Sequence, residues 1–157
     1  VRLARRYGKT VVLNPAPAGE IDEALFKDID YFTPNETEAE FYTGIRVADE
    51  QTAEQAADRL LEKGVKNVVI TLGKTGVYAK TEEFQGIVPS FRVNAVDTTG
   101  AGDAFNGGFC TALAEGKNVR DALLFANALA ALSVTRRGTS PAMPYREEIE
   151  KLLKGGN

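Results

Sequence analysis

The stretch Val96–Phe109 reads V-D-T-T-G-A-G-D-A-F-N-G-G-F, and its interpretation decides the interpretation of the whole chain. Residues 97–99 close an extended segment, and residues 100–102 form a turn of three small residues. An apolar helical run begins at Asp103 and continues through Phe105 and Phe109. The pattern therefore predicts a strand, a turn and the N-terminus of a helix.

The N-terminus of a helix is suited to anion binding because its first amide groups lack intrahelical partners and carry partial positive charge. A turn of small residues lets a phosphate approach those amides. Asp103 in the first helical turn can be a simple partner of the helix dipole. Beside a phosphate, however, its carboxylate would repel the bound anion, so its presence there would need a function. The function that fits is to take a proton from the attacking hydroxyl group of a second substrate.

The complete string is more specific than a glycine-rich turn. At Asp97–Asp103 it matches, without a mismatch, the D-T-x-G-A-G-D signature of the ribokinase-like (PfkB) carbohydrate kinases, which this chain resembles. The resemblance implies that Asp103 is the catalytic base. It also implies that the amides of Gly100, Ala101 and Gly102 form an anion hole for the transferred phosphoryl group.

Alternating strand and helix patterns predict an α/β fold with a mostly parallel sheet. The resemblance implies a three-layer α/β/α ribokinase-like (Rossmann-like) arrangement, here as the C-terminal half of the fold without the N-terminal lid. We expect residues 1–157 to form a single domain, and the absence of an initiator Met suggests the second half of a larger fold. Besides the motif helix and a helix that begins at Asn35, the expected elements are helices at 1–8, 21–29, 48–63, 119–134 and 145–153, and strands at 10–14, 30–33, 65–72, 77–80 and 84–88.

Composition excludes several functions. The net charge of −3 gives no electrostatic footprint for nucleic acid, and no apolar run reaches membrane-spanning length, so we expect a cytoplasmic protein without either partner. With no His and one Cys, neither a His-based metal site nor an internal disulfide is expected. Cys110 follows Phe109 in the apolar run, which predicts a small core residue.

Two short segments are candidates for nucleotide binding. Asn35 and Glu38 have the spacing of a helix cap, and the resemblance implies instead that they lie near the nucleotide phosphates and Mg²⁺. The stretch T-L-G-K-T-G at residues 71–76 is a turn by its glycines. The resemblance implies that Thr71, Gly73 and Gly76 belong to a loop against the phosphates and ribose of ATP, and a glycine turn is compatible with both interpretations.

The C-terminal region adds two further candidates. Asn127 lies in an alanine-rich helix, where it is either a core amide bonded to backbone or, by resemblance, a contact to adenine or ribose. Two arginines before a glycine, at 136–138, read as an anion patch or as charges at a helix C-terminus. The resemblance implies a K⁺ site formed mostly by backbone oxygens, in which Ala142 replaces a Ser of some family members; its residues are Asp97, Thr99, Ser133, Arg136, Gly138 and Ala142.

The resemblance implies an ATP-dependent sugar kinase that transfers the γ-phosphate of Mg·ATP to the primary hydroxyl of a sugar. Within the family, N-P-A-P after Leu13 and T-P-N-E-T-E-A-E at 33–40 favour D-ribose, with D-ribose 5-phosphate as product. The alternative is an isolated half-domain, inactive alone, that binds nucleotide weakly or forms a dimer through an exposed edge at Val11–Asn14. A dinucleotide-binding domain is disfavoured because the turn is not G-x-G-x-x-G.

Overall fold

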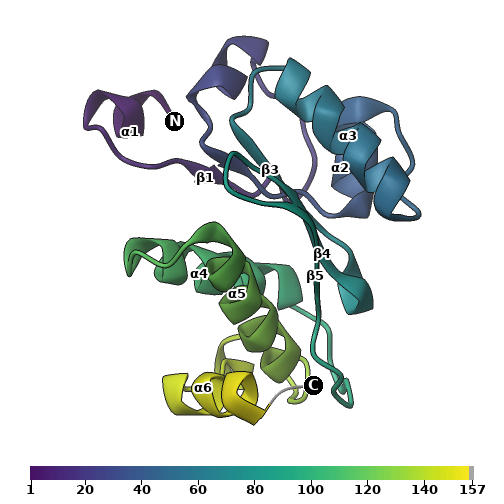
Figure 1. The fold of residues 1–157 in the computed structure, drawn as a ribbon, viewed down its shortest axis with the longest axis vertical. Coiled ribbons are helices and arrows are strands. Elements are labelled where there is room, and N and C mark those ends of the chain that lie inside the picture. The colour runs from purple at the N-terminus through teal and green to yellow at the C-terminus, as the bar shows by residue number, and fades with distance from the viewer. Residues whose placement is uncertain (156–157) are drawn as a thin grey trace. The chain divides into compact units, whose positions relative to one another are not determined.

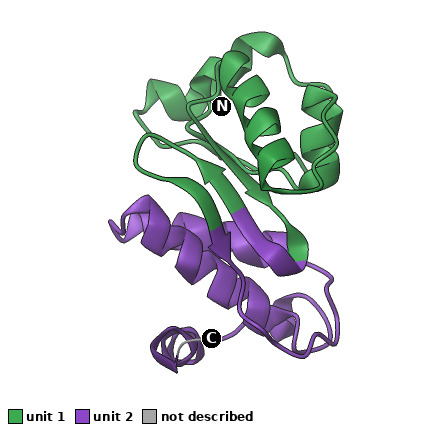
Figure 2. Ribbon diagram, turned by 45° about the vertical axis from the view of Figure 1, so that its right-hand side comes forward, with its two compact units in different colours: residues 1–73, 78–87 green, residues 74–77, 88–157 purple. Residues whose placement is uncertain are grey.

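The structure is a computed structural model that describes residues 1–155 (Figure 1). Its chain divides into two compact units. The first contains residues 1–73 and 78–87, and the second contains residues 74–77 and the chain from Val88 onward (Figure 2). The elements are, in order, α1 (Arg2–Arg6), β1 (Val12–Leu13), the 3₁₀ turn η1 (Glu23–Asp28), β2 (Tyr31–Phe32), α2 (Glu36–Thr43), α3 (Glu50–Glu62), β3 (Asn67–Thr71), the 3₁₀ turn η2 (Gly73–Thr75), β4 (Gly76–Lys80), β5 (Gln85–Pro89), α4 (Ala101–Ala114), α5 (Val119–Ser133), the 3₁₀ turn η3 (Ser140–Ala142) and α6 (Arg146–Gly155).

Five strands form one sheet in the order β1-β2-β3-β4-β5. The first three strands are parallel, with Val12 opposite Tyr31 and Phe32 opposite Val68. Strands β4 and β5 are neighbours in the sheet and are joined by a short turn, which makes them an antiparallel hairpin. At its closed end the Thr81 N–H donates to Phe84 O at 2.9 Å. The sheet is therefore mixed, and the predicted α/β class is confirmed.

The first unit has a core in which helix α3 packs against the strands. Its alanines at 53, 56 and 57, together with Leu60, are fully buried, and their spacing places them on one side of the helix. Phe26, Phe32 and Tyr42 meet edge to face, with ring centroids 5.2 to 6.3 Å apart. Such pairs add to the area that the rings bury, so this aromatic group fixes how η1 and α2 lie on the sheet.

Three local predictions were wrong. Ile21–Ile29 forms the short 3₁₀ turn η1 rather than an α-helix, since only six residues separate its cap, Asp22, from extended backbone at Ile29. No strand precedes the motif turn, because the N–H groups of Val96 and Asp97 both donate to the carbonyl of Val134 instead of to a neighbouring strand. Cys110 is exposed, not in the core.

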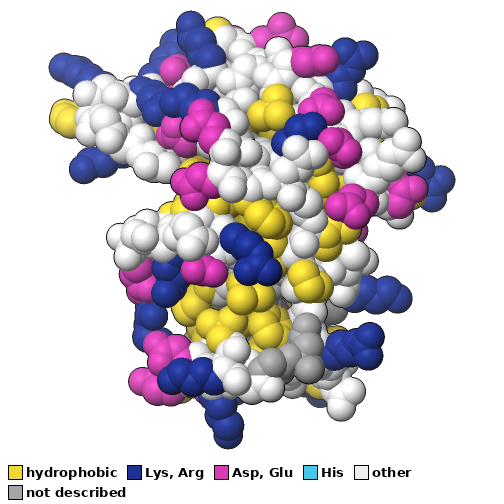
Figure 3. All heavy atoms as spheres, viewed as in Figure 1, with side chains coloured by type: hydrophobic (Ala, Val, Ile, Leu, Met, Phe, Trp, Pro, Cys, Tyr) yellow, Lys and Arg dark blue, Asp and Glu magenta, His cyan; other side chains and the backbone are white. Residues whose placement is uncertain are grey.

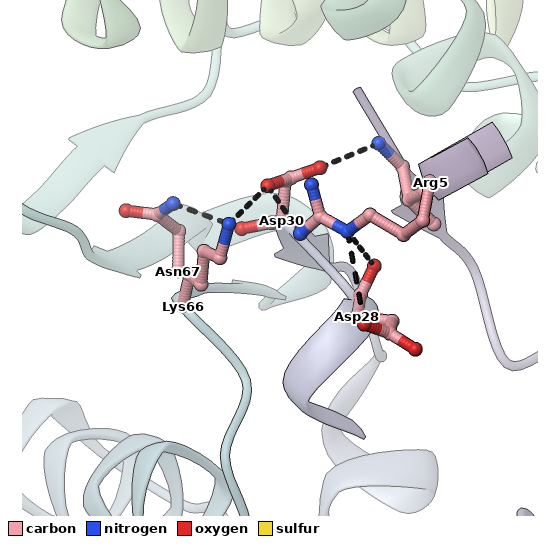
Figure 4. A network of polar contacts seen from close by, with 6 residues as sticks. Arg5, Asp28, Asp30, Lys66 and Asn67 are labelled. Carbon is pink, nitrogen blue, oxygen red and sulfur yellow. Dashed lines mark hydrogen bonds and ion pairs between the residues drawn. The ribbon is translucent and has the colours of Figure 1, made fainter. Parts of the chain in front are cut away.

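A charged network in the first unit is centred on Asp30 (Figure 4). Its carboxylate accepts hydrogen bonds from the N–H of Val11 at 2.8 Å, Arg5 at 2.8 Å and Lys66 at 3.0 Å. Burial alone would raise the pKa of Asp30, but these three donors outweigh it and hold the pKa below its ordinary value. The network therefore ties the segment before β1 to the start of β2 and β3.

Replacing Asp30 by Asn should make stability depend less on pH. A carboxylate with a lowered pKa stabilises the native state above its unfolded pKa of 3.8, and this contribution is lost as the pH falls through the folded value. We expect Asp30→Asn to lower the free energy of unfolding by about 1–3 kcal/mol near neutral pH. The deficit should shrink in urea titrations below about pH 4.

Glu62→Gln is the matched control, because the Arg59–Glu62 pair is exposed on α3, with side chains 63% and 64% accessible. It should change stability by less than about 0.5 kcal/mol. Equal losses in the two variants, or a deficit for Asp30→Asn that persists in acid, would contradict the stabilising role of the Asp30 network.

The second unit is built on a close contact between α4 and α5. A Cβ added to Gly108 would lie 3.1 Å from the Cα of Ala126 and 3.2 Å from Leu129 Cδ1, whereas one added to Gly107 meets nothing within 4 Å. Phe105 and Phe109, on the same helix as Gly108, are buried and stacked. The missing side chain at 108 therefore lets the two helices approach each other.

We expect Gly107→Ala and Gly108→Ala to differ in sign or size although both add one methyl group to the same helix. The first should raise the free energy of unfolding by about 0.5–1 kcal/mol through helix propensity. Gly108→Ala should lower the free energy of unfolding by about 1–3 kcal/mol, because the added methyl group overpacks the contact between α4 and α5. Chemical denaturation of both variants measures the difference, and indistinguishable values would show that the helices can separate at no cost.

Candidate active site

The motif turn places an exposed carboxylate beside unpartnered amides at the start of α4. Gly100 is the N-cap, with φ 78° and no side-chain cap. The N–H of Ala101 donates to Thr98 O at 3.2 Å, whereas those of Gly100 and Gly102 have no protein acceptor within residues 1–155. Asp103 is exposed, and its carboxylate has neither a hydrogen bond nor an ion pair in that part of the chain. An anion and a proton donor could therefore both be bound here.

Asp97 joins this turn to a loop far along the chain. Its Oδ1 accepts from the N–H of Thr99 at 3.0 Å, and its Oδ2 accepts from the N–H of Gly138 at 3.0 Å. The N–H groups of Gly138 and Thr99 lower the pKa of Asp97 to about 2. Thr139 completes the junction, because a Cβ on Gly100 would lie 3.1 Å from its Cγ2.

The positions predicted for K⁺ all lie in the second unit. The Ser133 hydroxyl donates to Ala130 O at 2.8 Å, the Arg136 side chain forms an ion pair with Glu148, and Ala142 is buried without a side-chain oxygen. Backbone carbonyls, the Asp97 carboxylate and the hydroxyls of Thr99 and Ser133 are the oxygens that these positions offer, and oxygen ligands suit a hard cation. Within residues 1–155 no group of three His, Cys, Asp or Glu side chains could hold a metal ion.

The nucleotide candidates of the first unit lie close to one another. Asn35 and Glu38 form a reciprocal capping box at the start of α2, with both hydrogen bonds at 2.8 Å. Thr71 forms a parallel bridge with Asn35, and Gly73 follows at the end of β3 with φ 51°. The capping interpretation is thus confirmed, and the contact with nucleotide stays a prediction.

The remaining candidates, Gly76 and Asn127, lie in the second unit. Asn127 is buried, and its side-chain N–H groups donate to the carbonyls of Val88 at 2.9 Å and Pro89 at 3.2 Å. These contacts are those of a core amide bonded to backbone, which is one of its two interpretations. A role in adenine or ribose binding is untested.

Sequence reasoning missed Glu148 and Thr139, which contact the predicted K⁺ loop and the motif turn respectively. Glu148 stands three residues after Tyr145 and accepts its N–H at 2.8 Å, so a capping signal was present. Nothing local to the sequence indicates the ion pair with Arg136.

Comparison with known proteins decides the family. Residues 2–146 match the family model described as pfkB family carbohydrate kinase. The chain belongs to the pfkB family. A ribokinase of Haemophilus influenzae is 48% identical to this PfkB chain over 153 residues, which cover 98% of the chain and 50% of that protein.

Solved structures agree with the fold of this PfkB chain. A ribokinase from Thermotoga maritima has a TM-score of 0.87 at 44% identity, covering 98% of this chain and 52% of that one. Ribokinase from Arabidopsis thaliana, complexed with ribose and ATP, has a TM-score of 0.86 at 36% identity, covering 98% and 50%. The predicted ribokinase-like fold is confirmed, and the chain spans about half the length of these relatives.

The surface adds two observations. Lys and Arg side chains alternate with Asp and Glu on the face shown in Figure 3, where no single-sign surface is formed. Within residues 1–155 no helix combines the length and the apolar character needed to cross a membrane.

In the candidate T-L-G-K-T-G loop of this PfkB chain, the two glycines should respond differently to substitution. A Cβ on Gly76, which has φ 116°, would lie 2.2 Å from Val88 O and 2.6 Å from Ser90 N. Gly76→Ala should therefore lower the free energy of unfolding by about 3 kcal/mol or more. Gly73→Ala should cost only about 1–2 kcal/mol, for its left-handed backbone, because the nearest atom would be 3.9 Å away. Thermal unfolding tests this order, and a larger loss for Gly73→Ala would contradict it.

Proposed function

We propose that the chain carries the nucleotide-binding and catalytic-base half of an ATP-dependent sugar kinase of the ribokinase type. The reaction would transfer the γ-phosphate of ATP to the 5-hydroxyl of D-ribose, giving D-ribose 5-phosphate. The observation that carries the proposal is the unpaired, exposed Asp103 carboxylate beside the free amides of Gly100 and Gly102. The ribose and ATP named for the Arabidopsis relative support the choice of substrates.

In this mechanism Asp103 accepts the proton of the attacking hydroxyl as its oxygen bonds to the γ-phosphorus, while the bond from that phosphorus to the bridging oxygen breaks and ADP leaves. The Gly100 and Gly102 amides, with Ala101 between them, stabilise the negative charge that develops on the transferred group. Catalysis of this kind depends on position more than on covalent chemistry, since phosphoryl transfer has a loose transition state. The Asp97 carboxylate, held by two N–H groups, keeps the turn in place for it.

The remaining candidates serve the nucleotide and the ions in this proposal. Mg²⁺ would neutralise the ATP phosphates near Asn35 and Glu38, which already support each other's orientation. Thr71 and Gly73 in the first unit, and Gly76 and Asn127 in the second, are the further positions proposed for nucleotide binding, and residues 1–157 are proposed to act as one α/β domain. K⁺ would be held by the oxygen donors of the loops at 97–99 and 133–142, and the reaction would take place in the cytoplasm.

A second candidate function is compatible with a chain that spans about half the length of these relatives. A half-domain that binds nucleotide without turnover, or that self-associates as a dimer, is compatible with this length. Strand β1 is the proposed edge for self-association, because it stands at one end of the strand order and pairs with β2 among the described residues.

The test is ADP release in the presence of ATP, Mg²⁺, K⁺ and D-ribose. Asp103→Asn should lower turnover by about 10²–10⁴-fold, because the amide cannot accept the proton. Asp121→Asn is the matched control: both carboxylates occupy the third position of a helix, in α4 and α5 respectively, and both are exposed. This control should keep the activity.

Equal turnover in Asp103→Asn and the unmodified chain would refute the assignment of the base. No turnover in any folded sample would favour the second candidate. Calorimetric titration with ATP and the sedimentation rate then distinguish a weak nucleotide-binding module from a self-associating one.

A further inference from the structure

We propose that Glu148 is a positioning residue for the motif turn, acting through Arg136 and the loop that follows it. This inference rests on the proposed function, because it concerns the same anion-binding turn. It assigns to α6 a role that neither the D-T-T-G-A-G-D signature nor the predicted cation site includes.

The first step is the contact between α6 and the loop. Arg136 Nη2 forms an ion pair with Glu148 Oε1, and Arg136 Nη1 lies 3.4 Å from Glu148 Oε2. The carboxylate also accepts the Tyr145 N–H at 2.8 Å, so it is fixed from a second side. These contacts hold the pKa of Glu148 below its ordinary value, chiefly through Arg136. Arg136 is therefore held against the first turn of α6.

The second step leads from the loop to the motif turn. Gly138, two residues after Arg136, donates its N–H to Asp97, whose other oxygen holds the Thr99 N–H. Thr139 then lies against Gly100, where a Cβ would be 3.1 Å from its Cγ2. Residues 136, 138 and 139 of one loop thus contact α6 on one side and the motif turn on the other.

The third step concerns the size of the effect. The side chains of Arg136 and Glu148 are 40% and 36% accessible, so water screens their interaction and the ion pair contributes little to global stability. Amide donors that stabilise a transition state are more sensitive, because small displacements weaken them. Loss of the ion pair should therefore change the hydrogen bonds of the motif turn more than it changes the free energy of unfolding of the whole chain.

Glu148 also has a purely structural interpretation, as the residue that caps α6 by accepting the Tyr145 N–H. Glu148→Gln separates the two roles, because glutamine keeps an acceptor for that N–H but loses the charge that binds Arg136. Arg136→Lys is the conservative variant, since it retains the positive charge.

A second ion pair of α6 supplies the matched control. Arg146 pairs with Glu115 at the end of α4, with side chains 43% and 37% accessible, and its guanidinium lies 5.4 Å from the ring centre of Phe125. Glu115→Gln therefore removes an equally exposed ion pair from the same helix. It leaves the loop at 136–139 untouched.

The experiment is amide hydrogen exchange of Thr99 and Gly138, read by NMR on the full chain. Glu148→Gln should speed exchange at both amides by roughly three- to fivefold, the range expected for an ion pair of this exposure. The single variant Arg136→Lys keeps the positive charge and should largely keep the slow exchange rates. Glu115→Gln should leave the exchange rates unchanged. Unchanged exchange in Glu148→Gln, or equal acceleration in Glu115→Gln, would overturn the proposal.

A kinetic readout separates this inference from the proposed function. In the ADP-release assay Glu148→Gln should lower kcat several-fold with the KM for ATP unchanged, because the donors act on the transition state. A fall in kcat equal to that of Glu115→Gln would overturn the positioning role. If the unmodified chain has no turnover, the proposed function fails for this chain, and the exchange rates still decide whether Glu148 orders the turn.

Discussion

The Asp97 carboxylate is the constraint on which the candidate site depends. One of its oxygens closes the turn at Thr99, and the other reaches across 41 positions of sequence to Gly138. A carboxylate that accepts two backbone N–H groups is a stronger acceptor than a neutral group, which agrees with a pKa near 2. The turn is thereby ordered by a charge, and the amides at the start of α4 can stay free of internal partners.

Features that depend on neighbours in sequence could be predicted. The capping box of Asn35 and Glu38 spans three residues, and the buried side of α3 repeats along a single helix, so periodicity and capping rules were sufficient. The motif turn was predicted for the same reason, since Gly100 has the left-handed backbone that its sequence favours.

Features that depend on distant contacts could not be predicted. The segment before Val96 has the composition of a strand, yet its N–H groups are taken by the carbonyl of Val134 at the end of α5. Likewise the sequence indicates only a surface charge at Glu148, because its ion pair with Arg136 forms only in the folded chain. Asn127 is intermediate: burial was predictable from its helix, but its acceptors at Val88 and Pro89 were not.

Some glycines of the motif are required by the fold, whereas others have no structural reason. Gly100 and Gly108 are required by the fold, the first by its backbone conformation and its contact with Thr139, the second by the approach of Ala126. Gly102 differs, because a Cβ there would meet nothing within 4 Å and its φ is not left-handed. Glycine in a helix costs about 0.5–1 kcal/mol relative to alanine, so the fold alone gives no reason for it.

The structure does not explain Gly107, which is equally open and lies five residues further along α4. Gly102 has an additional property that Gly107 lacks, namely an amide without a protein acceptor, one residue before the exposed Asp103. Close approach of a ligand to the backbone is the remaining physical reason for a glycine at such a position. The cost in helix stability at Gly102 therefore agrees with the proposal that an anion is bound there.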